Sequence, residues 1–136
     1  MKRRILLGYQ LLTGLSDTIT GILLMFSPAL ALGLMRLSLP SSSLPLLSYI
    51  GAFVLSVGIA CLYGAYLVTR QTFAQKLEVV WLLTAITRGL VTIFIVWKVT
   101  SGVLEAGWLS VAISDGTFAM IQGIGLYRRW LEDVAR

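Results

Sequence analysis

Four long apolar segments follow one another along the chain, and short polar linkers separate them. A helix needs about 20 mostly apolar residues to cross the hydrocarbon core of a bilayer, and each segment reaches that length. The pattern therefore predicts four transmembrane helices. We expect them over about residues 5–35, 46–69, 76–99 and 106–131, the first continuing past Pro28.

The linkers predict how these helices are connected. The first linker contains Pro40 and Pro45 around three consecutive serines, and proline interrupts a helix arriving from upstream. The segments 69–72 and 100–102 are short polar turns. Short connections favour antiparallel neighbours. We expect an all-α fold, an integral membrane four-helix bundle with up-down-up-down topology, in which residues 1–136 form a single transmembrane domain.

The composition of the chain also indicates that lipid, not water, surrounds it. Only 12% of the 136 residues are charged, 57% are apolar, and the mean hydropathy is +0.88. A soluble domain averages about 25% charged residues, so the counts exclude a soluble globular fold. The chain has no histidine, and its one cysteine, Cys61, lies in an apolar run. We therefore expect no metal site, no cofactor and no internal disulfide, with Cys61 acting as a small apolar side chain.

The distribution of lysine and arginine predicts the orientation. With four spans, both termini and the middle linker share one side of the membrane. Two cations, Arg36 and Lys98, fall on the other side, and eight fall on the first: Lys2, Arg3, Arg4, Arg70, Lys76, Arg128, Arg129 and Arg136. Cytoplasmic loops are enriched in these residues, so we expect cytoplasmic termini. The net charge of +5 then indicates contact with anionic lipids, not with nucleic acid.

Three charged residues fall inside the predicted spans: Asp17, Arg88 and Asp115. At 1.5 Å per residue, Asp17 and Arg88 lie about 18 Å and 16 Å from the inner boundary, and Asp115 about 14 Å from the outer one. All three therefore fall near the midplane. An isolated charge there costs about 2.5–3.5 kcal/mol on the insertion scale. We expect the three side chains to pair inside the bundle.

Polar residues accompany these charges at helical spacing. Gln10 lies seven residues before Asp17, Thr84 lies four before Arg88, and Gln122 lies seven after Asp115. Together these six residues form the predicted ligand site. Alternatively, the hydroxyl and amide groups only join the helices, as such groups do in membranes.

The charges of the predicted site do not balance. Two aspartates and one arginine leave a net charge of −1 in a low-dielectric region. This favours either a proton on Asp17 or Asp115, or a bound cation. Arg88 stays charged at any accessible pH, so it is suited to clamp a carboxylate, a phosphate or a quinone oxygen.

The second span also contains a stripe of small residues, Ala52, Ser56, Ala60 and Gly64. Small residues spaced by four allow two helices to approach closely in a membrane. We interpret the stripe as a packing surface, either within the bundle or between subunits.

The layout resembles the DoxX-like superfamily of small four-helix bacterial membrane proteins. The resemblance rests on Gly21-x4-Phe26-x-Pro28, on Gly51-x6-Gly58, on Thr87-Arg88-Gly89 and on the acid of the fourth span, Asp115. It implies a multi-pass protein of the bacterial inner membrane with Arg88 and Asp115 as typical polar positions. Proteins of this kind include a quinone-linked thiosulfate oxidoreductase subunit. Asp17 in the first span departs from the pattern of polar positions that is typical of this superfamily.

The leading functional hypothesis is a module that binds or transports a small amphipathic or anionic ligand, such as a quinone, a lipid or an organic ion. A proton exchanging on one aspartate would couple binding to the gradient. The alternative is a non-catalytic accessory subunit of a larger membrane redox complex, in which the charges are purely structural. The expected partners are membrane lipids, together with a larger membrane complex or further copies of the chain.

Two other classes are less consistent with the residues. A proton-coupled exporter of the small multidrug type has four spans and an acid in the first, but Arg88 would repel cationic drugs. An enzyme is disfavoured because the chain offers no nucleophile–base pair, metal cluster or glycine-rich phosphate loop.

Overall fold

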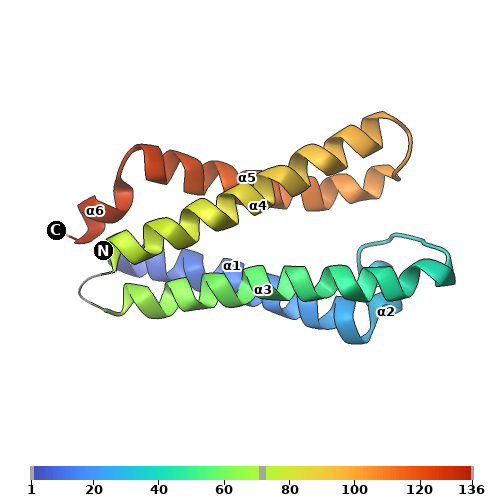
Figure 1. Cartoon of the computed structure of the whole chain (residues 1–136), viewed down its shortest axis with the longest axis horizontal. Coiled ribbons are helices and arrows are strands. Elements are labelled where there is room, and N and C mark those ends of the chain that lie inside the picture. The colour runs from blue at the N-terminus through green and yellow to red at the C-terminus, as the bar shows by residue number, and fades with distance from the viewer. Residues whose placement is uncertain (1, 71–72, 136) are drawn as a thin grey trace. The chain divides into compact units, whose positions relative to one another are not determined.

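A computed structural model describes residues 2–70 and 73–135 of the chain. Its helices are α1 (Lys2–Phe26), α2 (Pro28–Leu34), η1 (Ser41–Ser43), α3 (Leu44–Val68), α4 (Ala74–Thr100), η2 (Ala106–Trp108), α5 (Leu109–Tyr127) and α6 (Trp130–Ala135) (Figure 1). None of the described residues lies in a strand, which confirms the all-α class. Gln71 and Thr72 of the predicted middle linker, and the predicted cytoplasmic cation Arg136, lie outside the described residues.

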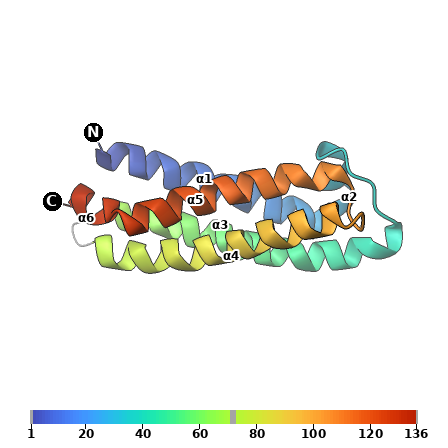
Figure 2. The ribbon, with the colours of Figure 1, turned by 90° about the horizontal axis from the view of Figure 1, so that it is seen from above.

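The chain divides into two compact units. One comprises Met1–Thr69 and the other Arg70–Arg136. Each unit pairs two long helices, α1 with α3 in the first and α4 with α5 in the second (Figure 1). Seen from above, α4 and α5 also run side by side (Figure 2). The single domain over residues 1–136 stays a prediction, and each unit is described below by itself.

Among the described residues, three helical segments are long and apolar enough to cross a membrane: Ser41–Val68, Ala74–Thr100 and Ala106–Tyr127. They correspond to the second, third and fourth predicted spans. The α1 helix has 25 residues, but it does not reach the same level of hydropathy. Gln10, Asp17 and the threonines between them and just after lower its apolar content. The prediction of transmembrane helices is therefore supported by composition for three of the four spans.

The first predicted helix is divided between Phe26 and Pro28. Ser27 has φ −146° and ψ 59°, outside the helical region, and Pro28 begins α2. The ring of a proline disfavours the helical conformation at the residue before it, whereas proline itself suits the first position of a helix. The continuous helix expected over 5–35 is thus two helices.

The last predicted helix is also divided. Helix α5 ends at Tyr127, where the Arg128 amide donates to the Ile124 carbonyl at 2.9 Å. Arg129 has φ 53°, a left-handed conformation that a helix cannot continue through. The chain changes direction at this residue, and α6 begins at Trp130. A single helix over 106–131 was predicted because the apolar pattern contains no signal for this turn.

Glycines bring α1 and α3 into close contact in the first unit. A methyl group on Gly58 would lie 2.5 Å from the Thr18 backbone nitrogen, and one on Gly21 would lie 2.5 Å from the Leu55 backbone nitrogen. These backbones approach closely because neither glycine has a side chain between them. The two helices therefore pack antiparallel, with the end of α1 near the beginning of α3 (Figure 1).

The packing surface of α3 includes only one end of the predicted stripe. Ala52 and Ser56 are exposed and Ala60 is half-buried, whereas Gly64 is buried together with Gly51 and Gly58. Gly64 therefore belongs to the buried face of α3, and packing of Ala52 and Ser56 between subunits stays a prediction. Cys61 is fully buried, as expected for a small apolar side chain.

The second unit is packed around large side chains of α4. Leu77, Trp81 and Ile95 are buried, and a methyl group on Gly125 of α5 would overlap the Trp81 ring. Closer to the η2 end of α5, a methyl group on Gly116 would lie 3.2 Å from the Thr92 methyl. These contacts set the register in which Arg88 meets α5.

Candidate functional site

An ion pair joins the middle of α4 to α5. The Arg88 guanidinium donates a hydrogen bond to the Asp115 carboxylate, with 2.7 Å between the nitrogen Nη1 and the oxygen Oδ1. The side chain of Arg88 is 3% exposed and that of Asp115 is 20% exposed. A charged pair in such a poorly solvated position is strongly coupled, because little water screens it. The expected pairing of Arg88 with Asp115 is confirmed.

Phe118 completes one side of this pair. Its ring centroid lies 4.9 Å from the Arg88 Cζ atom, within the range of a cation–π contact. Phe118 follows Asp115 by three residues, so both side chains face α4 from one side of α5. Phe118 is not among the predicted site residues, although its spacing from Asp115 is a signal that indicates it.

Thr92 lies one turn beyond Arg88 on α4. Its hydroxyl donates to the Arg88 carbonyl at 2.8 Å and lies 3.3 Å from the Ala112 carbonyl of α5. The bond to its own helix satisfies the hydroxyl, as is common for threonine in helices. The second contact places a polar bridge between the two helices beside the ion pair.

Gln122 is the most unusual polar residue of the unit. Its side chain has no exposed surface, and neither its amide nitrogen nor its amide oxygen has a hydrogen-bond partner among the described residues. A buried amide without partners costs about 1–3 kcal/mol, so most such groups in proteins are bonded. Gln122 follows Asp115 by two helical turns, or about 10 Å along α5.

Thr84 is buried on α4, one turn before Arg88, as the sequence predicts. Its hydroxyl donates to the Val80 carbonyl of the same helix at 2.7 Å. The only hydrogen of this hydroxyl is therefore used within the helix, and Thr84 can offer a ligand only an acceptor oxygen.

The remaining predicted site residues belong to the first unit. Gln10 has no exposed surface, and its amide has no hydrogen-bond partner among residues 2–70 and 73–135. Asp17 is half-buried on the same helix. The structure thus brings Arg88, Asp115 and Gln122 onto one helix pair, whereas their grouping with Gln10 and Asp17 stays a prediction.

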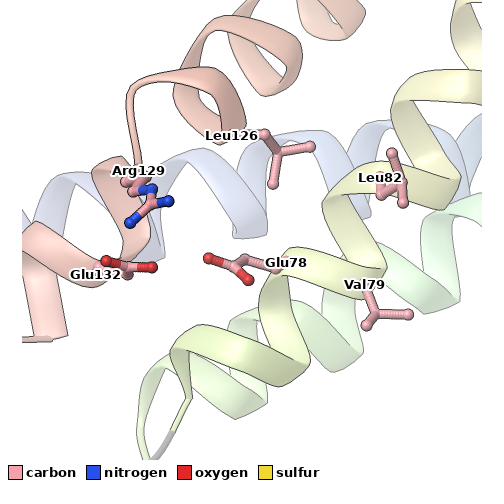
Figure 3. A pocket seen from close by; sticks show the side chains of 6 residues that line it. All are labelled: Glu78, Val79, Leu82, Leu126, Arg129 and Glu132. Atoms are coloured by element: carbon pink, nitrogen blue, oxygen red, sulfur yellow. The ribbon is translucent and has the colours of Figure 1, made fainter.

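A groove lies at the end of the second unit where α4 begins and α5 ends. Its volume is about 500 Å³, and its lining residues come from α4, α5, α6 and the turn before α6. They are Glu78, Val79, Leu82, Leu126, Arg129 and Glu132 (Figure 3). Of these charged residues, Arg129 is predicted only as a cation of the cytoplasmic side, because nothing in the spacing of Glu78, Arg129 and Glu132 indicates that they meet.

The fold and the ion pair define the class of protein: an all-helical chain with three helices apolar enough for a membrane and a buried charge pair between two of them. Comparisons with protein-family models, with curated proteins and with solved structures find no match to this chain. Membership of the DoxX-like superfamily stays a prediction.

Proposed function

We propose that this chain is an integral membrane protein that binds a small amphipathic molecule with an anionic or carbonyl head group beside Arg88, Asp115 and Gln122. The observation that supports this most directly is Gln122. It is a fully buried amide without hydrogen-bond partners among the described residues, on the helix face that also presents Asp115. A ligand oxygen or hydroxyl would satisfy that amide and recover the cost of burying it.

Insertion in a membrane is supported by the surface of the helices. In addition to the three helices with high hydropathy, α1 has a row of exposed apolar residues that includes Leu11, Leu15, Ile19 and Ile22. Water would not tolerate so much exposed apolar surface, whereas lipid would. We therefore propose α1 as the fourth span of an up-down-up-down bundle. The excess of lysine and arginine on one side supports the proposal that both termini lie in the cytoplasm.

The chemistry of the ion pair suggests how binding would be coupled to protons. Arg88 is held by the Asp115 carboxylate, and a proton on Asp115 would weaken that bond. The guanidinium would then be able to bind the anionic or carbonyl group of a ligand. Release of the proton would restore the pair and expel the ligand. Binding and proton transfer would thus be linked at one residue.

The resemblance to the DoxX-like superfamily extends this proposal. It suggests the inner membrane of a bacterium as the location and a quinone as one candidate ligand. It also suggests association with a membrane redox complex or with further copies of the chain.

A second candidate function is a structural subunit without a ligand. The observation that favours it is the directly closed Arg88–Asp115 pair, with 2.7 Å between donor and acceptor. In this case the pair only determines which helices associate, a role known for buried polar groups in other systems.

The two functions differ in how the chain responds to amphiphiles. The full chain in lipid nanodiscs is titrated with decylubiquinone and separately with oleate, and its melting temperature is measured. A ligand at 100 times its dissociation constant stabilises a protein by about 2.7 kcal/mol. We expect at least one probe to raise the melting temperature of the wild type.

Two variants make the result specific. Gln122→Leu should remove the stabilisation by the probe while the protein still folds. Gln75→Leu, which replaces an exposed glutamine at the beginning of α4, should keep it. Failure of both probes to stabilise the wild type, or equal stabilisation of the Gln122 variant, contradicts the binding function and favours the structural one.

A further inference from the structure

The groove at the end of the second unit combines charged and apolar walls. In Figure 3 the Arg129 guanidinium and the two carboxylates, from Glu78 and Glu132, occupy one side of the opening. Leu126 and Leu82 lie on the other side. A volume of about 500 Å³ is large enough for a lipid head group and the beginning of its acyl chains. The groove is thus amphipathic along its length.

The charged wall is open to a ligand. Arg129 is exposed, Glu78 and Glu132 are half-buried, and within residues 2–70 and 73–135 the structure records no ion pair for these three side chains. The turn orients Arg129, because its backbone has φ 53° and its amide donates to the Leu126 carbonyl at 3.1 Å. A left-handed arginine is uncommon, so the surrounding helices hold this residue in place.

The position of the groove along the helices corresponds to a bilayer interface. This step rests on the proposed membrane insertion of α4. Glu78 lies in the first turns of α4, and Leu82 lies about 6 Å further along the helix axis. Val79 and Leu82 are 57% and 52% exposed. In a bilayer, the charges would therefore lie among the head groups and the apolar residues beside the acyl chains.

We propose that this groove binds a membrane lipid whose head group contains a phosphate and a primary ammonium, as in phosphatidylethanolamine. The ammonium donates hydrogen bonds to the Glu78 and Glu132 carboxylates. The planar guanidinium of Arg129 donates to the phosphate oxygens, a geometry that arginine matches with two parallel bonds. One acyl chain lies along Val79, Leu82 and Leu126, where it covers apolar surface.

The same charges disfavour other common lipids. A lipid with a phosphate and a glycerol head group is anionic, and the two carboxylates would repel it while one guanidinium attracts it. A phosphocholine head group is zwitterionic, as the ethanolamine head group is, but its quaternary nitrogen has no N–H to donate. Only the primary ammonium offers a hydrogen bond to each carboxylate while the phosphate meets Arg129.

Native mass spectrometry of the full chain tests this proposal. The protein is purified in detergent and titrated with dioleoyl phosphatidylethanolamine, phosphatidylglycerol and phosphatidylcholine separately. We expect the ethanolamine lipid to bind at least about tenfold more tightly than the other two, since it alone forms both sets of charged hydrogen bonds.

Four variants localise the binding. The double variant Glu78→Gln with Glu132→Gln, and the single variant Arg129→Gln, should each weaken binding of the ethanolamine lipid about tenfold. Asp133→Asn and Arg128→Gln replace exposed charges next to the groove that do not line it, and they should bind as the wild type does. Equal binding of the three lipids, or unchanged binding by the groove variants, would overturn the proposal.

The lipid site and the proposed function can be tested separately. Resistance of the chain to extraction from membranes by alkaline carbonate tests membrane insertion alone. The response to decylubiquinone or oleate should be unchanged in the groove variants, because Arg88 and Gln122 do not line the groove. A chain that is extracted by carbonate contradicts both proposals, whereas an inserted chain without lipid preference contradicts only the lipid site.

Discussion

Arg88 of α4 and Asp115 of α5 are joined by a hydrogen bond of 2.7 Å, although 27 residues separate them along the chain. Phe118 covers the guanidinium from one side, and the Thr92 hydroxyl donates to the backbone carbonyl of Arg88. A charge pair with so little exposure stabilises the helix pair only when both partners are present. The consequences for stability therefore depend on whether one or both charges are removed.

Removing one charge should destabilise the chain more than removing both. Arg88→Met or Asp115→Leu leaves a single buried charge, and the expected loss is about 3–5 kcal/mol. The double variant leaves an apolar contact and should be markedly more stable than either single variant. Thermal unfolding in detergent measures all four proteins of this cycle. Additive effects of the two substitutions would show that the pair is not coupled.

Replacing Gln122 by leucine should stabilise the fold. The amide is fully buried without hydrogen-bond partners among the described residues, and leucine has a similar volume and no polar atoms. We expect a gain of about 1–2 kcal/mol in the absence of added ligand, measured by thermal unfolding. Gln75→Leu, at an exposed position, is the control and should change stability by less than about 0.5 kcal/mol. A destabilised Gln122 variant would mean that the amide has a structural partner.

Gly125 should not tolerate a side chain. A methyl group there overlaps the Trp81 ring and lies 3.0 Å from the Trp130 ring, so Gly125→Ala should cost about 1–3 kcal/mol through overpacking. Gly123→Ala is a matched control on the same helix, because nothing lies within 4 Å of the added methyl. That variant should be neutral or slightly more stable, since alanine favours helices. The melting temperatures of the two variants in one detergent give the comparison.

Gly58 has the corresponding role in the first unit. Gly58→Ala places a methyl group 2.5 Å from the Thr18 backbone nitrogen, and a backbone atom cannot move aside as a side-chain end can. The expected cost is about 2–3 kcal/mol. Gly8→Ala on α1, with nothing within 4 Å, is the control. Cross-linking of cysteines placed on α1 and α3 should decrease only in the Gly58 variant, and an equal decrease in both would contradict the packing argument.

Much of the site could be predicted from the pattern of residues. Placing a charge in an apolar helix is costly, so the positions of Arg88 and Asp115 indicate that each has a partner. Helical spacing also predicts that Thr84 lies on the same face of its helix as Arg88, and Gln122 on the same face as Asp115. Both side chains are buried, as this predicts. The spacing gave no distinction between them, although the Thr84 hydroxyl is bonded within its helix and the Gln122 amide has no partner among the described residues.

The breaks in the helices were harder to predict. The one before Pro28 has a local signal, because proline constrains Ser27. The one at Arg129 has none, because the left-handed conformation of this residue does not follow from the residue type. This second break has the larger consequence, since it brings Arg129 and Glu132 beside Glu78.

The sequence by itself determined the helical class, the apolar segments and the polar residues that face inward, because these depend on periodicity and composition within each segment. Only the tertiary structure decided the register between α4 and α5: which carboxylate Arg88 binds, that Phe118 covers it, and that Gly125 receives the Trp81 ring. Register depends on how the side chains of two helices fit together in space. A pattern read along either helix contains no information about that fit.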